Sequence, residues 1–175
     1  YTMSGLSNVT SALFISGGVN ESGSLREIEI RRNGKVISKY DFYDFLLSGS
    51  VRSEVKLLNG DVIFIPFIKN KIKIGGKFKR PHTYEFLQGE TIADAINFAG
   101  GFESVIQPKE IELNTVSFSS LKREVFSIPN NLQGLSRPLA NGDMINTSSR
   151  SGIISESVTL TGQFMNPGEY SVVPG

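Results

Sequence analysis

Hydrophobic and polar residues alternate in the segment KIKIGGKF at residues 71–78. The residues of one parity are Ile72, Ile74, Gly76 and Phe78. A period of two predicts a strand with one buried and one exposed face. Residues 158–164 keep the apolar half of this pattern and replace the lysines with neutral polar residues. The strand pattern is therefore repeated along the chain, whereas its positive charge is not.

A helical pattern follows in GETIADAINFAGG, residues 89–101. Thr91 is the predicted N-cap, with Asp94 three residues later to complete a capping box, and Gly100 is the predicted stop. The apolar face comprises Ile92, Ala95, Ile96 and Ala99. An equivalent helix near the start is predicted with Asn8 as N-cap and Gly17 as stop. Its inner face comprises Val9, Ala12, Leu13 and Ser16.

The remaining elements complete one structural unit. A turn at Pro81 is followed by a predicted strand at 84–86. The dipeptide Asn33-Gly34 predicts a hairpin joining the strands 26–32 and 35–40. A short helix over 40–49 and a last strand that Pro66 ends follow. The predicted fold is α+β of the β-grasp kind, with a mixed sheet packed on one main helix per unit.

The chain repeats itself. Residues 12–18 align with 95–101 and residues 26–30 with 109–113, both with an offset of 83, and 57–61 aligns with 139–143 with an offset of 82. The opening phrase recurs with an offset of 86, which places Gly76 on Gly162. We therefore predict three tandem units. They are residues 1–68, a first unit without its opening strand; residues 69–150, a complete second unit; and residues 151–175, the opening strands of a third. Such an array, cut in mid-unit, is expected to be a piece of a longer protein.

Composition narrows the function classes. Hydrophobic residues make up 39% and charged residues 20%, with a net charge of +1, so nothing favours nucleic acid as a partner. No run of 18 apolar residues or secretory leader is present. The absence of cysteine excludes disulfides and thiolate sites, and the single histidine, His82, excludes histidine clusters. We expect no cofactor and no metal.

Three motifs in repeated order resemble the SLBB, or soluble-ligand-binding β-grasp, family. A turn signature, a helix ending in A-G-G and a closing N-G-D carry the resemblance. The matching residues are Gly76, Pro81, Tyr84, Gly100, Gly101, Asn141, Gly142, Asp143, Gly162, Pro167 and Tyr170. The sequence departs from the family pattern at His82, which replaces the turn glycine, and at Ser16, which replaces the alanine of A-G-G. We expect structural roles for the motif residues.

Tandem SLBB units are similar to those of Wza-type outer-membrane polysaccharide export proteins of Gram-negative bacteria. The resemblance implies a non-catalytic segment on the periplasmic face of the outer membrane, forming homo-oligomeric rings or collars for capsular or extracellular polysaccharide. Its implied partners are further copies of itself, the polysaccharide, and the inner-membrane synthesis and export machinery. A rival expectation is a module that holds a small soluble ligand such as a cobalamin-like molecule. An enclosed apolar pocket with convergent polar groups would favour this rival.

One basic run is a candidate binding site for an anionic glycan or a neighbouring subunit. It comprises Lys69, Lys71, Lys73, Lys77, Lys79 and Arg80. The simpler interpretation is a solvated strand face whose lysines discourage edge-to-edge pairing.

Other candidate sites have simpler structural interpretations. His82 could be a catalytic base, but the simpler interpretation is an exposed turn residue. Glu27 and Glu29 could form a carboxylate pair, but they alternate with isoleucines and are more simply the solvated face of a strand. The glycine pairs at 17–18 and 100–101 come after predicted helices, so they are helix stops and not phosphate loops. The aromatic cluster at 40–45 is typical of core, although such rings also stack on sugars. No catalytic constellation of a carbohydrate-active enzyme is matched. Finally, the spare opening strand at 157–166 is a candidate for a swap into another copy.

Overall fold

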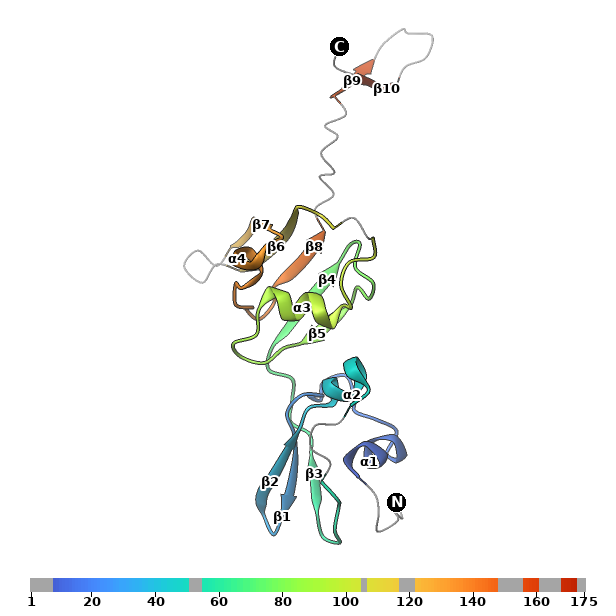
Figure 1. Ribbon diagram of the computed structural model, residues 1–175, viewed down its shortest axis with the longest axis vertical. Helices are drawn as coiled ribbons and strands as arrows, with labels where there is room; N and C mark the ends of the chain where they lie inside the picture. The colour runs from blue at the N-terminus through green and yellow to red at the C-terminus, as the bar shows by residue number, and fades with distance from the viewer. Residues whose placement is uncertain are drawn as a thin grey trace.

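The computed structural model describes residues 8–50, 55–104, 107–116, 122–147, 156–160 and 168–172. It has the predicted α+β architecture (Figure 1). The described strands form sheets of order β2-β1-β3 and β5-β4-β8-β6-β7, and β9 (Glu156–Leu160) pairs with β10 (Gly168–Val172). We refer to α1 to β3 as the first unit and to β4 to β8 as the second unit. The boundaries predicted at 68/69 and 150/151 remain predictions.

The first unit consists of α1 (Val9–Ile15), β1 (Ile28–Arg32), β2 (Lys35–Tyr40), α2 (Phe42–Ser48) and β3 (Val62–Phe64). Asn8 caps α1 by accepting the backbone N–H of Ser11 at 2.8 Å, as predicted. Asn33 and Gly34 both have positive φ, 51° and 76°, which is the type I′ geometry expected for this dipeptide. The core cluster comprises Val9, Leu13, Ile28, Ile30 and Tyr40.

The second unit consists of β4 (Lys71–Gly75), β5 (Thr83–Glu85), α3 (Ile92–Phe98), β6 (Glu110–Val116), β7 (Arg123–Pro129), α4 (Leu132–Leu135) and β8 (Met144–Thr147). Strand β4 runs antiparallel to β5 and parallel to β8. Figure 1 shows α3 lying across one face of this mixed sheet. The predicted capping box of Thr91 and Asp94 is present. The fully buried side chains under α3 include Ile72, Ile74, Ile111 and Ile145.

The repeat seen in the sequence is a repeat of strand register. In the first unit Glu29 lies opposite Phe64 and Ile30 opposite Ile63. Adding 83 to the β1 numbers and 82 to the β3 numbers gives the observed β6–β8 pairs, Glu112 with Asn146 and Leu113 with Ile145. β3 is therefore the structural equivalent of β8.

Three local predictions need correction. The strand predicted for 71–78 ends at Gly75, because Gly76 has a φ of +84° and turns the chain closely past Thr147. Phe78 is still buried, through an isolated bridge with Phe102. The next strand is Thr83–Glu85 and not 84–86. Ser16 does not face the core, since it is the exposed C-cap of α1 and its hydroxyl donates to the carbonyl of Leu13.

Candidate functional site at the junction of the two units

Glu85, at the end of β5, is the centre of the contact between the two units and is only 6% exposed. Its Oε1 accepts a 2.5 Å hydrogen bond from the Ser24 hydroxyl, and its Oε2 accepts the Leu25 N–H at 2.8 Å. The Ser24 Oγ also accepts the backbone N–H groups of Arg26 and Glu27. A hydroxyl has one proton, so Ser24 is oriented to donate it to Glu85. Both oxygens of this buried carboxylate are therefore satisfied by the first unit.

Arg26 crosses the junction with a side chain that is 8% exposed. Its Nε and Nη2 donate to Oδ2 of Asp41 at 3.0 and 2.8 Å, and its Nη1 donates to Oε2 of Glu90 at 2.6 Å. The guanidinium carbon lies 4.8 Å from the ring centroid of Tyr43 and 5.0 Å from that of Phe98. One arginine thus joins a carboxylate and an aromatic ring of each unit, using the planar, forked geometry that lysine lacks.

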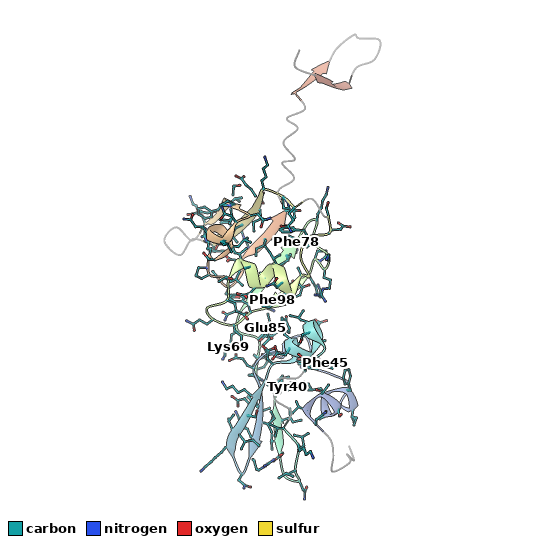
Figure 2. All side chains as sticks on the ribbon, viewed as in Figure 1. Tyr40, Phe45, Lys69, Phe78, Glu85 and Phe98 are labelled. Atoms are coloured by element: carbon teal, nitrogen blue, oxygen red, sulfur yellow. The ribbon has the colours of Figure 1, made fainter. Side chains whose placement is uncertain are left out.

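Tyr43 enters the second unit from α2. Its ring meets Phe98 edge to face at 5.5 Å, and its hydroxyl oxygen accepts the Glu85 N–H at 3.0 Å. Burial in this contact raises the pKa of Tyr43 to about 12. Figure 2 shows Phe98, Glu85 and Lys69 gathered where the units meet. At the rim of the contact, the 66% exposed side chain of Lys69 pairs with Glu27 at 2.8 Å.

A groove of about 410 Å³ opens beside this network. It is lined by Glu21, Leu25, Tyr43, Ile68, Lys71, His82, Thr83, Tyr84 and Glu85. Because Glu85 is fully engaged with Ser24 and Leu25, the exposed groups available to a solute are those of Glu21, Lys71, His82 and Thr83. Aromatic rings beside hydroxyl and cationic groups are suited to binding a polar, ring-shaped solute such as a sugar.

The structure divides the predicted basic run. Lys71 and Lys73 lie exposed on β4, and Lys71 lines the groove. Lys77 and Lys79 lie exposed on the following loop. Arg80 donates to the carbonyl of Phe98 at the end of α3, and Lys69 forms the ion pair at the rim. The binding role of the run remains a prediction.

The motif residues of the second unit have structural positions. Tyr84 donates its hydroxyl to the carbonyl of Arg80 across the turn that contains Pro81. Asn141 Oδ1 accepts the N–H of Lys71, and the Gly142 N–H donates to the carbonyl of Lys71, both at 2.9 Å.

The remaining motif positions are consistent with this picture. The Asp143 carbonyl accepts the Lys73 N–H at 2.9 Å, so the N-G-D turn fixes the start of β4 against β8. Gly100 and Gly101 follow α3 with φ of 74° and 82°. Tyr170 lies in β10 (Gly168–Val172), whereas Gly162 and Pro167 lie outside the described residues.

Comparison with known families supports the same unit. Residues 71–113 match the family model of the SLBB domain. This match supports an SLBB-domain protein. It covers β4, β5, α3 and the first residues of β6, which is the part of the chain that contributes Glu85, Glu90 and Phe98 to the junction. No curated protein matches the chain significantly.

No described helix is both long and apolar enough to cross a membrane. No group of three or more His, Asp or Glu side chains in the described ranges is arranged to hold a metal ion.

Sequence reasoning missed the junction. Glu85 reads as an ordinary polar residue beside Tyr84, and Ser24 and Arg26 belong to no motif. One usable signal was a local failure of the repeat, because Ser24 and Leu25 align with Gln107 and Pro108, directly before the matching segments 26–30 and 109–113. Of the aromatic cluster, Tyr40 is buried and bonds Thr10, whereas Tyr43 lies in the junction.

Proposed function

We propose that the chain is a non-catalytic periplasmic segment of a capsular or extracellular polysaccharide export protein of the outer membrane. Its role is to make contacts between subunits of an oligomeric ring or collar through which the polymer passes. The SLBB match at 71–113 is the observation that carries the proposal, because SLBB domains occur in polysaccharide export proteins and bind ligands. The partners proposed are further copies of the chain, the polysaccharide and the inner-membrane synthesis and export machinery.

The junction favours a rigid spacer. A conduit wall requires units with a fixed relative orientation, and a default inter-domain contact leaves domains free to move. Here two buried charged side chains, Glu85 and Arg26, form directional, charge-assisted hydrogen bonds between the two units. Such a contact defines one geometry and opposes sliding. We therefore assign the junction a structural role in positioning successive units.

The test is deletion of the gene in its host followed by complementation. The expected result is loss of polymer from the cell surface with continued synthesis, so that polymer accumulates inside the envelope, and recovery of surface polymer on complementation. Surface and cell-associated polymer are measured separately after fractionation. Unchanged surface polysaccharide in the deletion strain would refute the proposal.

The groove supports a second candidate function, the holding of a small soluble ligand. Its volume of about 410 Å³ falls within the usual range of ligand pockets, about 300–1,000 Å³. Titration of isotope-labelled protein with oligosaccharides of the host polymer, and separately with cobalamin, distinguishes the two ligand classes. Shifts at His82 and Thr83 with oligosaccharide alone favour the glycan, and shifts with cobalamin alone favour the small-ligand module.

A matched pair of variants tests the role of charge in the groove. The double substitution of Lys71 and Lys73 to Ala removes two exposed charges from β4 beside the groove, while the same change at Lys77 and Lys79 removes two from the loop. We expect only the first to weaken binding of an acidic oligosaccharide. Equal loss in both variants would indicate a general electrostatic effect and no groove contact.

A further inference from the structure

β7 forms an outer edge of the five-stranded sheet, and its apolar side chains are exposed. Val125 and Phe126, in the middle of the strand, are 59% and 36% exposed, and Leu132 on the adjoining α4 is 93% exposed. Among the described strands, β7 pairs only with β6. The elements before and after it, β6 and α4, are both described, so this edge belongs to the interior of the second unit and not to an end of the chain.

The outer edge of β7 presents the N–H groups of every second residue. Asn130 donates its N–H at 2.8 Å to the carbonyl of the residue before β6. Because backbone N–H groups alternate in direction along a strand, those of Arg123, Val125 and Ser127 point away from β6. Pro129 occupies the next outward position, where its missing N–H costs no bond within the sheet. Three outward N–H groups in one regular strand are a template for strand addition.

The equivalent edge of the first unit is protected. β2 pairs with β1 as β7 pairs with β6. Its register shifts at a bulge opposite Ile30, and Lys35 and Lys39 are exposed along it. Bulges and lysines are common protections against edge-to-edge pairing. β7 has neither, since its seven residues keep one register with β6 and its two charges, Arg123 and Glu124, stand together at its start.

We propose that β7 pairs with β7 of a second copy of this chain, antiparallel and across a two-fold axis at Val125. In this register Val125 lies opposite the partner's Val125, and Arg123 lies opposite the partner's Ser127. All three outward N–H groups of each copy then gain a carbonyl partner, and the two sheets become one. A two-fold contact closes after two copies, so it is separate from the ring contacts proposed above.

Charge and backbone chemistry disfavour the neighbouring symmetric registers. An axis at Glu124 or at Arg123 places that residue opposite its own copy, and like charges directly opposite are destabilising. An axis at Phe126 places Arg123 opposite Pro129. Proline has no N–H to donate, and this carbonyl already accepts the N–H of Asn131 at 2.9 Å. The proposed axis avoids all three conflicts.

On the open face of the joined sheet, an arginine meets a glutamate. Ser127 donates its hydroxyl to Glu110 of β6 in the same copy. Because the partner's Arg123 lies opposite Ser127, its guanidinium comes within reach of this carboxylate. In the single copy Arg123 donates to neutral acceptors, Oδ1 of Asn114 and Sδ of Met144. Pairing of the two copies therefore supplies Arg123 with an acceptor of opposite charge.

On the other face, the same kind of contact forms beside an aromatic ring. Phe126 lies opposite Leu113 of β6, on the side of the sheet that carries the core. The guanidinium carbon of Arg137 lies 4.8 Å from the centroid of the Phe126 ring. The partner's Glu124 lies opposite Phe126 and therefore beside Arg137. Two-fold symmetry repeats both arginine–glutamate contacts, so the edge is complementary to itself.

Cysteine cross-linking tests the axis, because the chain contains no cysteine. Val125→Cys in the full chain places two thiols opposite each other, with the Cα atoms of such a pair about 5.5 Å apart and within disulfide range. We expect a disulfide-linked homodimer on mild oxidation. The matched control is Val36→Cys, at a position that is 47% exposed on the protected edge of β2. Val125→Cys should cross-link about tenfold faster than this control.

Two further variants test the direction of pairing. Arg123→Cys and Ser127→Cys are made in full chains that carry tags of different size. When the two are mixed and oxidised, we expect a disulfide-linked heterodimer, whereas each variant alone should form little homodimer. Homodimers of each variant without the heterodimer would mean parallel pairing and would overturn the proposal.

Val125→Pro tests the backbone bonds in solution. The Val125 N–H points outward, so proline removes no bond of the single copy but removes the bonds at the axis. Light scattering over a range of concentrations should show a dimer for wild type and for Val125→Thr. Val125→Pro should weaken this dimer about tenfold or more, with an unchanged circular dichroism spectrum.

Three results overturn the proposal. They are a wild-type chain that is monomeric at every concentration, a dimer that Val125→Pro leaves intact, and equal cross-linking of Val125→Cys and Val36→Cys. The last result covers the case in which another segment of the same chain occupies the β7 edge. No host or polymer is needed, so this proposal and the export proposal can fail independently.

Discussion

Substitution of Arg26 by Met should loosen the junction without unfolding either unit. The change removes three hydrogen bonds to the carboxylates of Asp41 and Glu90, at 2.6 to 3.0 Å. Met keeps the unbranched stem and a favourable sulfur contact with the Tyr43 and Phe98 rings, worth about 0.3–1.5 kcal/mol. The decrease in junction stability that we expect in this variant therefore comes mostly from the loss of the positive charge.

The magnitude follows from the burial of the pair. Removing one partner of a buried ion pair costs about 3–5 kcal/mol, because the other partner is left uncompensated. Asp41 and Glu90 are 23% and 20% exposed, and each also accepts a backbone N–H, so both retain other partners. We therefore expect the lower limit, about 3 kcal/mol, which corresponds to about two powers of ten in the equilibrium for opening of the junction.

Amide hydrogen exchange measures this equilibrium locally. The N–H groups of Leu25 and Glu85 are both bonded across the junction, the first to the Glu85 carboxylate and the second to Tyr43. In Arg26→Met their protection should fall about a hundredfold, while that of Ile111 in the second core is unchanged. The matched control is Lys69→Met, which removes one charge from an exposed pair at the same junction and should leave protection nearly unchanged. Equal protection in the two variants would refute the reasoning.

Three further predictions follow from the same geometry. Glu85→Gln should destabilise the junction by about 1–3 kcal/mol in urea unfolding, because its NH₂ group must face a donor, the Ser24 hydroxyl or a backbone N–H; unchanged stability would contradict the assigned hydrogen-bond directions. The pKa of Tyr43 is raised from 10.0 to about 12, so the folded state loses stability as pH rises from about 10 to 12. An absorbance titration should show one phenol that ionises at higher pH than the others and that is absent in Tyr43→Phe. Ionisation of the Tyr43 phenol near pH 10 would contradict this prediction. Arg32 lowers the pKa of Asp61 from 3.8 to about 2, so the ion pair contributes stability above about pH 4 and loses it as pH falls to about 2. Acid-unfolding curves of wild type and Arg32→Met should therefore differ in this pH range, and curves with the same pH dependence would contradict the pairing.

The local part of the fold could be predicted because its determinants are close in sequence. The capping box of Thr91 and Asp94 spans three residues, and the type I′ turn needs only Asn33 and Gly34. The strand predicted through Phe78 was too long because alternation of apolar residues continues past Gly76, where the backbone turns. A positive φ at one glycine is not encoded in periodicity. The α+β class could be predicted because hairpin and helix signals recur in the same order along the chain, and the structure confirms this class.

The junction could not be predicted from the pattern because the residues that meet across it lie at least 42 positions apart in the sequence. Ser24 and Glu85 are separated by 61 residues, and Arg26 and Glu90 by 64. In the sequence, Glu85 cannot be distinguished from a solvent-exposed glutamate of a strand, because it is the first unit that buries it. Family-level motifs did not help either, because the matched signature describes the interior of one unit and the contact lies between two.

Along this chain the strand register repeats from unit to unit, whereas the residues of the junction do not. Fixed offsets relate the β1–β3 pairs to the β6–β8 pairs, and another fixed offset relates the β4–β5 pairs to the β9–β10 pairs. The junction groups do not repeat, since Leu25 aligns with Pro108, which has no N–H to donate, and Glu85 aligns with Ser171, which has no second acceptor oxygen. A unit built on the β9–β10 hairpin cannot reproduce the contact seen between the first two.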